Sequence, residues 1–129
     1  MAKKRVLARI RLALAASQDV RKILKWTEEK FGKRAQERYR ELLLQALRDI
    51  EAYPERPGSK EWPDILAIGT RTYHLSFSRS RTKGQAVKEP RHFILYRLRK
   101  DGGIEVGRIL HDGRDLQLHL PKDYLRHDS

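Results

Sequence analysis

Three arginines in the C-terminal half of the chain share a strand face with apolar side chains, where a charge is costly. Arg71 alternates with Tyr73, Leu75 and Phe77, Arg97 with Phe93 and Leu95, and Arg108 with Ile104, Val106 and Leu110. Such a guanidinium must be paired, lie at the rim of the sheet or line a binding concavity. We therefore take Arg71, Arg97 and Arg108 as candidate target-binding residues. The alternative for each is a structural salt bridge to a carboxylate such as Glu28 or Glu105.

Among five histidines, His74, His92 and His111 could approach one another across adjacent strands. The sequence shows neither tight ligand spacing nor an acidic second shell, so we expect no metal site. His111 is a fourth target-binding candidate, because it ends a strand just before the Asp112-Gly113 turn and an imidazole can transfer protons near neutral pH. With Arg71 and Arg108 it would form the catalytic set of a ribonuclease that works by attack of the 2′-hydroxyl. Phosphate-binding glycine loops, nucleophile elbows and paired carboxylates are absent from the sequence, and we expect no cofactor.

The composition describes a small, strongly basic protein. The 129 residues predict one domain, and 29 Lys and Arg against 17 Asp and Glu give a formal net charge of +12. This charge attracts nucleic acid, anionic membrane or an acidic protein segment. The absence of cysteine excludes disulfides and a thiolate nucleophile. Arg9 and Arg11 interrupt the apolar segment 6–16, and no apolar run is long enough for a membrane span, so we expect a cytoplasmic protein.

The elements that would position these residues follow from hydrophobic periodicity. Period two predicts strands over 6–12 and 70–78, and three-and-four spacing predicts helices over 17–31 and 33–53, separated by Gly32. Residues 92–98 are apolar in nearly every position, which predicts a central strand covered on both faces. The turn signal at residues 100–103 makes 104–110 the returning strand of a hairpin. Ser17 is the expected N-cap of the first helix, with Asp19 in its first turn. An irregular connection is predicted over 54–64, with Trp62 at the core edge, and a solvated basic loop without aromatics for base stacking over 79–91. A short helix over 112–120 ends at Pro121, and the C-terminal tail 121–129 is predicted to be loose from Tyr124 onward. The result is an α+β fold with an antiparallel helical hairpin on a mainly antiparallel sheet.

Segments 26–32, 53–57, 69–73, 92–97 and 108–111 (WTEEKFG, YPERP, GTRTY, HFILYR and RILH), with the later Asp115 and the HLP of residues 119–121, occur in the order seen in ParE-type toxins. The chain resembles this branch of the RelE/ParE superfamily from about Val6 to Pro121. The resemblance implies a toxin that poisons DNA gyrase and is neutralised by a ParD-like antitoxin. An acidic antitoxin tail would lay an amphipathic helix along the hairpin and add a strand to the sheet edge. Its candidate contacts are Trp26, Tyr39, Leu43 and Arg48.

Three hypotheses about function remain. The first is a non-enzymatic gyrase inhibitor. The second is a RelE-like, ribosome-dependent mRNA endoribonuclease that uses Arg71, Arg108 and His111. The third is an inactive basic binding module. The sequence departs from the ParE pattern in one place: the 79–91 loop is longer and more basic than the short hairpin usual in ParE toxins. This loop could change the choice of target or antitoxin.

Overall fold

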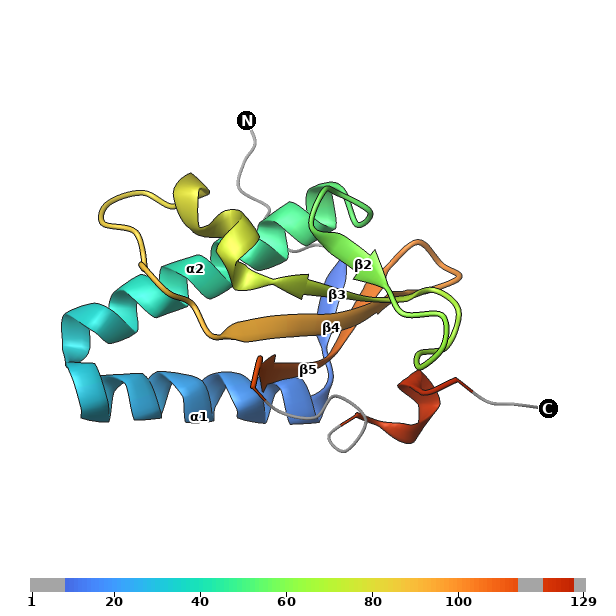
Figure 1. Cartoon of the computed structure of the whole chain (residues 1–129), viewed down its shortest axis with the longest axis horizontal. Coiled ribbons are helices and arrows are strands. Elements are labelled where there is room, and N and C mark those ends of the chain that lie inside the picture. The colour runs from blue at the N-terminus through green and yellow to red at the C-terminus, as the bar shows by residue number, and fades with distance from the viewer. Residues whose placement is uncertain (1–8, 114–119, 127–129) are drawn as a thin grey trace.

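The computed structural model describes residues 9–113 and 120–126 and confirms the α+β class. Its sheet has the strand order β1-β5-β4-β3-β2, in which β1 pairs with β5 in parallel and the other pairs are antiparallel. The strands are β1 (Ile10–Leu12), β2 (Ser59–Glu61), β3 (Thr70–His74), β4 (His92–Leu98) and β5 (Ile104–His111). The helices are α1 (Leu14–Phe31) and α2 (Lys33–Ala52), with short 3-10 helices η1 (Leu75–Arg81) and η3 (Lys122–Tyr124). Figure 1 shows α1 and α2 as an antiparallel hairpin beside the sheet.

The helical hairpin closes at a single residue. Gly32 adopts a φ of 95°, a left-handed conformation that favours glycine, and its N–H donates to the Glu28 carbonyl. The N-terminus of α1 was predicted three residues too late. The helix begins at Leu14. The residue before it, Ala13, is its N-cap and donates its N–H to the Val106 carbonyl of β5, so Ser17 is not the N-cap. The alanines that precede Ser17 are good helix formers and need no side-chain cap.

The sequence reading of residues 54–81 was wrong at two places. Ser59–Glu61 forms an edge strand on β3 where an irregular connection was expected. The strand predicted over 70–78 ends at His74, because the His74 ring accepts the Ser76 N–H and starts η1. The Ser78 hydroxyl then donates to the buried Asp49 carboxylate at 2.6 Å. This local capping and the buried hydrogen bond override the alternating pattern, and Phe77 is left on the surface.

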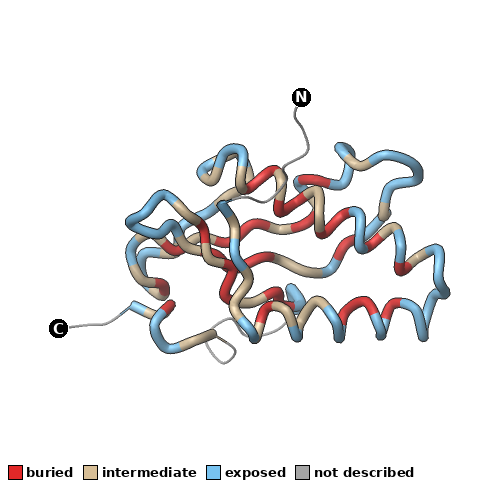
Figure 2. The backbone as a smooth tube through the Cα atoms, turned by 180° about the vertical axis from the view of Figure 1, so that it is seen from behind, coloured by how far each residue is buried: buried red, intermediate tan, exposed pale blue. Residues whose placement is uncertain are grey.

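The central strand β4 is covered on both faces, as its apolar sequence predicted. Ile94 and Tyr96 pack in the main core beneath the helices, and Leu95 lies in a smaller cluster on the opposite face with Leu66 and Tyr124. Trp62 packs at the edge of that cluster, as expected. Figure 2 shows the buried residues along the strands and the inner side of the hairpin.

The prediction of a loose tail was wrong for residues 124–126. Tyr124 is buried, and Leu125 forms a β-bridge with Leu66, because the outer face of the sheet is apolar and needs a cover. Residues 6–8 of the first predicted strand, most of the helix predicted over 112–120, and residues 127–129 lie outside the described residues. No helix in the described ranges is long and apolar enough to cross a membrane.

Candidate functional site

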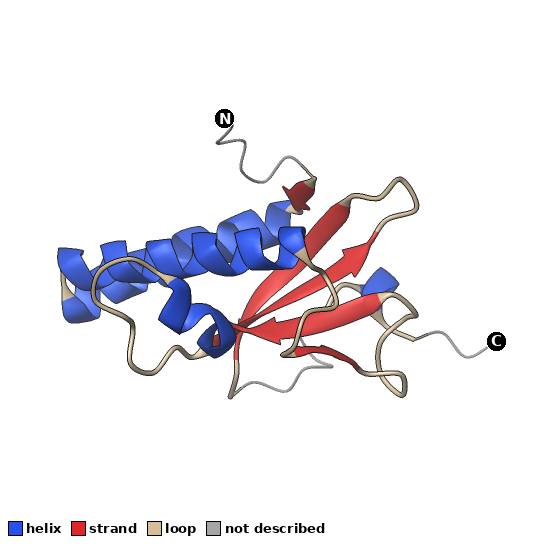
Figure 3. Cartoon of the chain, turned by 90° about the horizontal axis from the view of Figure 1, so that it is seen from above, coloured by secondary structure: helices blue, strands red, loops and turns tan. Residues whose placement is uncertain are grey.

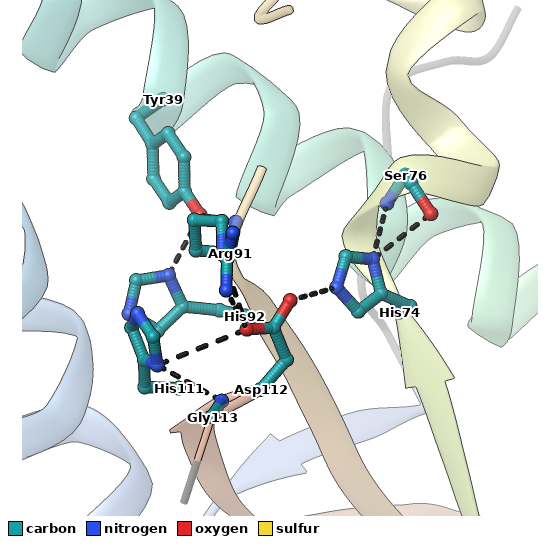
Figure 4. Close-up of polar contacts among 8 residues, drawn as sticks. All are labelled: Tyr39, His74, Ser76, Arg91, His92, His111, Asp112 and Gly113. Atoms are coloured by element: carbon teal, nitrogen blue, oxygen red, sulfur yellow. Dashed lines mark hydrogen bonds and ion pairs between the residues drawn. The ribbon is translucent and has the colours of Figure 1, made fainter. Parts of the chain in front are cut away.

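Three histidines meet at one end of the sheet (Figure 4). His74 ends β3, His92 begins β4 and His111 ends β5. Because neighbouring strands are antiparallel, these three positions lie at the same end of the sheet. His92 and His111 are direct cross-strand partners, with ring centroids 5.4 Å apart and planes at 86°. The approach of the three histidines that the sequence suggested is therefore observed.

His92 is buried beside Tyr39. The Tyr39 hydroxyl accepts the Arg91 main-chain N–H at 3.1 Å and shares a hydrogen bond of 2.7 Å with the His92 Nδ1 atom. Burial, helped by the charge of nearby His111, lowers the pKa of His92 to about 4. Burial likewise raises the pKa of Tyr39 to about 12. His92 is therefore a neutral, structural histidine at physiological pH.

Asp112 connects the other groups of the cluster. Its carboxylate accepts from His74 Nε2 at 2.9 Å and from the Arg91 guanidinium at 2.9 and 3.1 Å. Burial by itself would raise the pKa of Asp112, but the hydrogen bonds and charges of His74 and Arg91 outweigh it and hold that pKa below its usual range. The cluster thus contains the ionised Asp112 carboxylate, which accepts hydrogen bonds from His74 and Arg91.

His111 is the histidine of this cluster that is most available for proton transfer. Its side chain is 44% exposed, and its Nδ1 accepts the Gly113 N–H at 3.0 Å, which places the proton of the neutral ring on Nε2. Within residues 9–113 and 120–126, no group of three or more His, Cys, Asp or Glu side chains is arranged to hold a metal ion. The chemistry that this end of the sheet offers is acid–base chemistry at His111 beside the Arg91 charge.

Arg108 forms a two-pronged ion pair with Asp19 of α1, at 2.7 and 3.0 Å. The hydrogen bond that Arg108 donates to Asp19, together with the charge of that carboxylate, raises the pKa of Arg108 despite partial burial. The same carboxylate accepts the Ile109 N–H at 2.9 Å. Gly107 is an extra residue in β5, so Arg108 lies opposite Leu95 and not in line with Val106 as the sequence suggested.

Arg97 and Arg71 also have partners. Arg97 pairs with Glu105 and Asp123, each at 2.9 Å, and stacks over the Tyr124 ring. Arg71 donates to the Ser59 hydroxyl at 2.6 Å and lies 3.8 Å from Glu61. The salt-bridge alternative is thus observed for all three arginines, with Glu105 as expected for Arg97. Glu28 instead accepts from Gln36.

The structure does not bring the suggested nuclease set together. Arg71 lies opposite Tyr96 on β4, whereas His111 lies opposite His92, four positions earlier on the same strand. Arg71 and His111 are also on β3 and β5, with β4 between them. Arg108 is near His111 in the chain, but its guanidinium is held by Asp19.

The antitoxin-contact candidates divide into surface and core residues. Trp26 is 51% exposed and Arg48 is partly exposed. Tyr39 and Leu43 are only 7% and 3% exposed and belong to the main core. In this structure a partner can therefore contact Trp26 and Arg48 but not Tyr39 or Leu43.

Two carboxylates that organise this part of the molecule were not singled out from the sequence. Asp112 was assigned only to a turn. Asp49 is buried and accepts from Gln45, Ser78 and Arg81. Its spacing from Leu42 and Ala46 places it on the apolar stripe of α2, and a charge on such a stripe is the signal that would have found it.

A protein-family model described as the ParE toxin of the type II toxin–antitoxin system parDE matches residues 10–116. The chain belongs to this family. It is accordingly the toxin of a type II toxin–antitoxin system, and the family implies an antitoxin partner. The resemblance noted in the sequence is thereby confirmed. No curated protein matches this ParE-family toxin significantly.

Proposed function

We propose that this toxin acts in the cytoplasm without catalysis, by binding DNA gyrase. The observation that carries the proposal is the dispersal of the suggested nuclease set: Arg71 is separated from His111 by a strand, and Arg108 is bound to Asp19. An arginine held by a carboxylate is poorly placed to stabilise the developing charge of a phosphate. Membership in the ParE family supports the same choice.

We propose further that the antitoxin is ParD-like, with an acidic segment that binds the outer surface of the hairpin. The net charge of +12 supports an acidic partner. Exposed Trp26 provides an aromatic anchor of the kind that dominates protein interfaces, and Arg48 adds a charge on α2. An acidic peptide should therefore bind with strong salt dependence, and Trp26→Ala should weaken that binding more than Tyr53→Ala, another exposed aromatic.

The gyrase proposal is tested with the purified full-length toxin, purified gyrase and relaxed plasmid. We expect loss of supercoiling and accumulation of linear, gyrase-cleaved DNA, both reversed when antitoxin is added first. His111→Ala should inhibit gyrase as the wild-type toxin does. Normal supercoiling at a large molar excess of a toxin that still arrests growth would overturn the proposal.

Cleavage of mRNA is the second candidate function, because exposed His111 lies beside Arg91 and the His74–Asp112 pair. In this mechanism, proton transfer by His111 would assist attack of a 2′-hydroxyl on the adjacent phosphorus and departure of the 5′-oxygen. Controlled expression separates the two candidates when DNA breaks and mRNA ends are scored in the same cells. Cleaved mRNA that disappears in His111→Ala but persists in Asp64→Ala, a distant surface change, would favour the nuclease.

A further inference from the structure

The positive charge of this toxin is concentrated at one end of the molecule. Residues 21–40, which form the tip half of the helical hairpin, contain eight Lys and Arg against three Glu. Residues 79–91 contain five against one. These 33 residues carry nine of the twelve net positive charges, and the other 96 carry three. Figures 1 and 3 show the loop after η1 beside the tip half of the hairpin, so the two segments form one basic end.

The cations of this basic end are on the surface. Twelve of the thirteen are exposed, and the other, Arg38, is intermediate. Among the residues that the structure describes, the ion pairs of these cations are those of Arg81 with Asp49 and Arg91 with Asp112. The field of this end is therefore only weakly compensated.

The basic loop is solvated, as the sequence suggested, and side-chain contacts anchor it to the rest of the fold. Ser78 and Arg81 bind the buried Asp49, and the Arg79 guanidinium donates to the Lys88 carbonyl. At the other end Pro90 is buried and the Arg91 N–H donates to Tyr39. These anchors present the loop against α2, where a hollow of about 300 Å³ separates them. Its lining residues are Arg34, Glu37, Arg38, Glu41, Thr82, Lys83, Gly84 and Gln85.

The hairpin tip supplies the aromatic surface that the basic loop lacks. Trp26 is 51% and Phe31 68% exposed, and their rings meet edge to face with centroids 5.6 Å apart. Lys25, Lys30 and Lys33 are exposed neighbours in the chain. Exposed aromatic rings among cations are the combination by which proteins hold unpaired bases and the phosphates that join them.

We propose that the hairpin tip and the basic loop together bind single-stranded DNA, with bases stacked on Trp26 and Phe31 and phosphates along the hollow. The choice of DNA over RNA rests on the proposed gyrase target; the binding chemistry itself does not. Glu37 and Glu41 also line the hollow, so its lining has a net charge of only +1. The binding is therefore weak, and its salt dependence comes from the exposed cations of the hairpin tip and the basic loop that contact phosphates.

The aromatic contribution is tested by fluorescence anisotropy of the full-length toxin with labelled dT20 at low salt. The double substitution Trp26→Ala and Phe31→Ala should weaken binding about fivefold or more, the least expected from loss of one stacked base. Tyr53→Ala removes an equally exposed aromatic at the other end of α2 and should leave binding unchanged. Circular dichroism checks that each variant is folded. Wild-type affinity in the double variant would overturn the proposal and leave the tip to the antitoxin alone.

The charge contribution is tested with opposite changes in the same assay. Lys30→Gln, Lys33→Gln and Arg34→Gln together should reduce the slope of log affinity against log salt by about 2, whereas Arg11→Gln, Lys100→Gln and Lys122→Gln should not. Glu37→Gln with Glu41→Gln should strengthen binding. Tighter binding to rU20 or to duplex than to dT20 would overturn the assignment to single-stranded DNA. Gyrase supercoiling, measured on the same proteins, reports separately on the proposed target.

Discussion

His92 shows how one buried side chain sets the acid sensitivity of this fold. Its ring is packed between Tyr39 and His111 and shares a hydrogen bond with the Tyr39 hydroxyl through Nδ1. Protonation would place a charge beside a second imidazole in a poorly solvated position. The fold therefore resists protonation of His92 until the pH falls well below the pKa of a free histidine.

We predict that the free energy of unfolding declines as the pH falls from about 6.5 to 4. In this window the unfolded chain binds a proton at His92, whereas the folded chain, with a pKa of about 4, does not. Stability is thus present above pH 6.5 and lost toward pH 4, by up to about 3 kcal/mol. Urea unfolding at pH 7 and 4.5 measures the loss.

His92→Gln should remove most of this pH dependence. His111→Gln should retain most of it, because burial lowers the pKa of His92 more than the charge of His111 does. If the free energy of unfolding falls equally with pH in the wild-type toxin and in His92→Gln, groups other than His92 govern acid stability.

At the scale of elements, Asp19 joins α1 to β5. Strand β1 pairs with β5 only over Ile104–Val106, and beyond this the Asp19 carboxylate accepts the Ile109 N–H and the Arg108 guanidinium. The aspartate expected to interact with the helix dipole instead occupies a sheet edge that would otherwise offer free hydrogen-bonding groups.

Asp19→Ala should destabilise the fold by about 3 kcal/mol. The change leaves a partly buried guanidinium without this carboxylate and the Ile109 N–H without its acceptor. The comparison is Asp64→Ala, which removes an exposed partner of Arg126 and should cost less than about 1 kcal/mol. Chemical denaturation at pH 7 measures both, and similar losses for the two variants would contradict this role of Asp19.

The elements with long, regular patterns were predicted from the sequence. The two helices follow from spacing, β4 from its nearly continuous apolar run and β5 from the hairpin-turn signal between them, because these elements are buried over many residues. The short strand β2, the end of β3 at His74 and the packed residues 124–126 were not predicted, because each depends on a contact with a distant segment.

The site follows the same division. Antiparallel order brings His74, His92 and His111 to one edge, and the sequence suggested it. The partner of each arginine depends on packing, so Asp19 was not paired with Arg108. The bulge at Gly107 breaks the alternation before Arg108, and a period-two pattern does not predict such a bulge.

At the scale of the whole molecule, the sheet separates a main core under the hairpin from a smaller one under residues 120–126. Gly107 lies where residues 120–126 pack against the outer face of the sheet. A Cβ atom there would be 2.7 Å from the Tyr124 ring, closer than any real contact. The Tyr124 hydroxyl also donates to Glu105 at 2.6 Å, so the ring cannot easily move away.

Gly107→Ala should therefore destabilise the toxin by about 1 to 3 kcal/mol, through overpacking between the sheet and its outer cover. The cost should shrink by at least about 1 kcal/mol when Tyr124→Ala is already present, since the ring that the new methyl group meets is gone. Urea denaturation of the two single variants and the double variant measures this coupling. If the substitution costs the same in both backgrounds, Tyr124 is not what restricts position 107, and residues 120–126 do not pack as tightly on the sheet as the contact distances indicate.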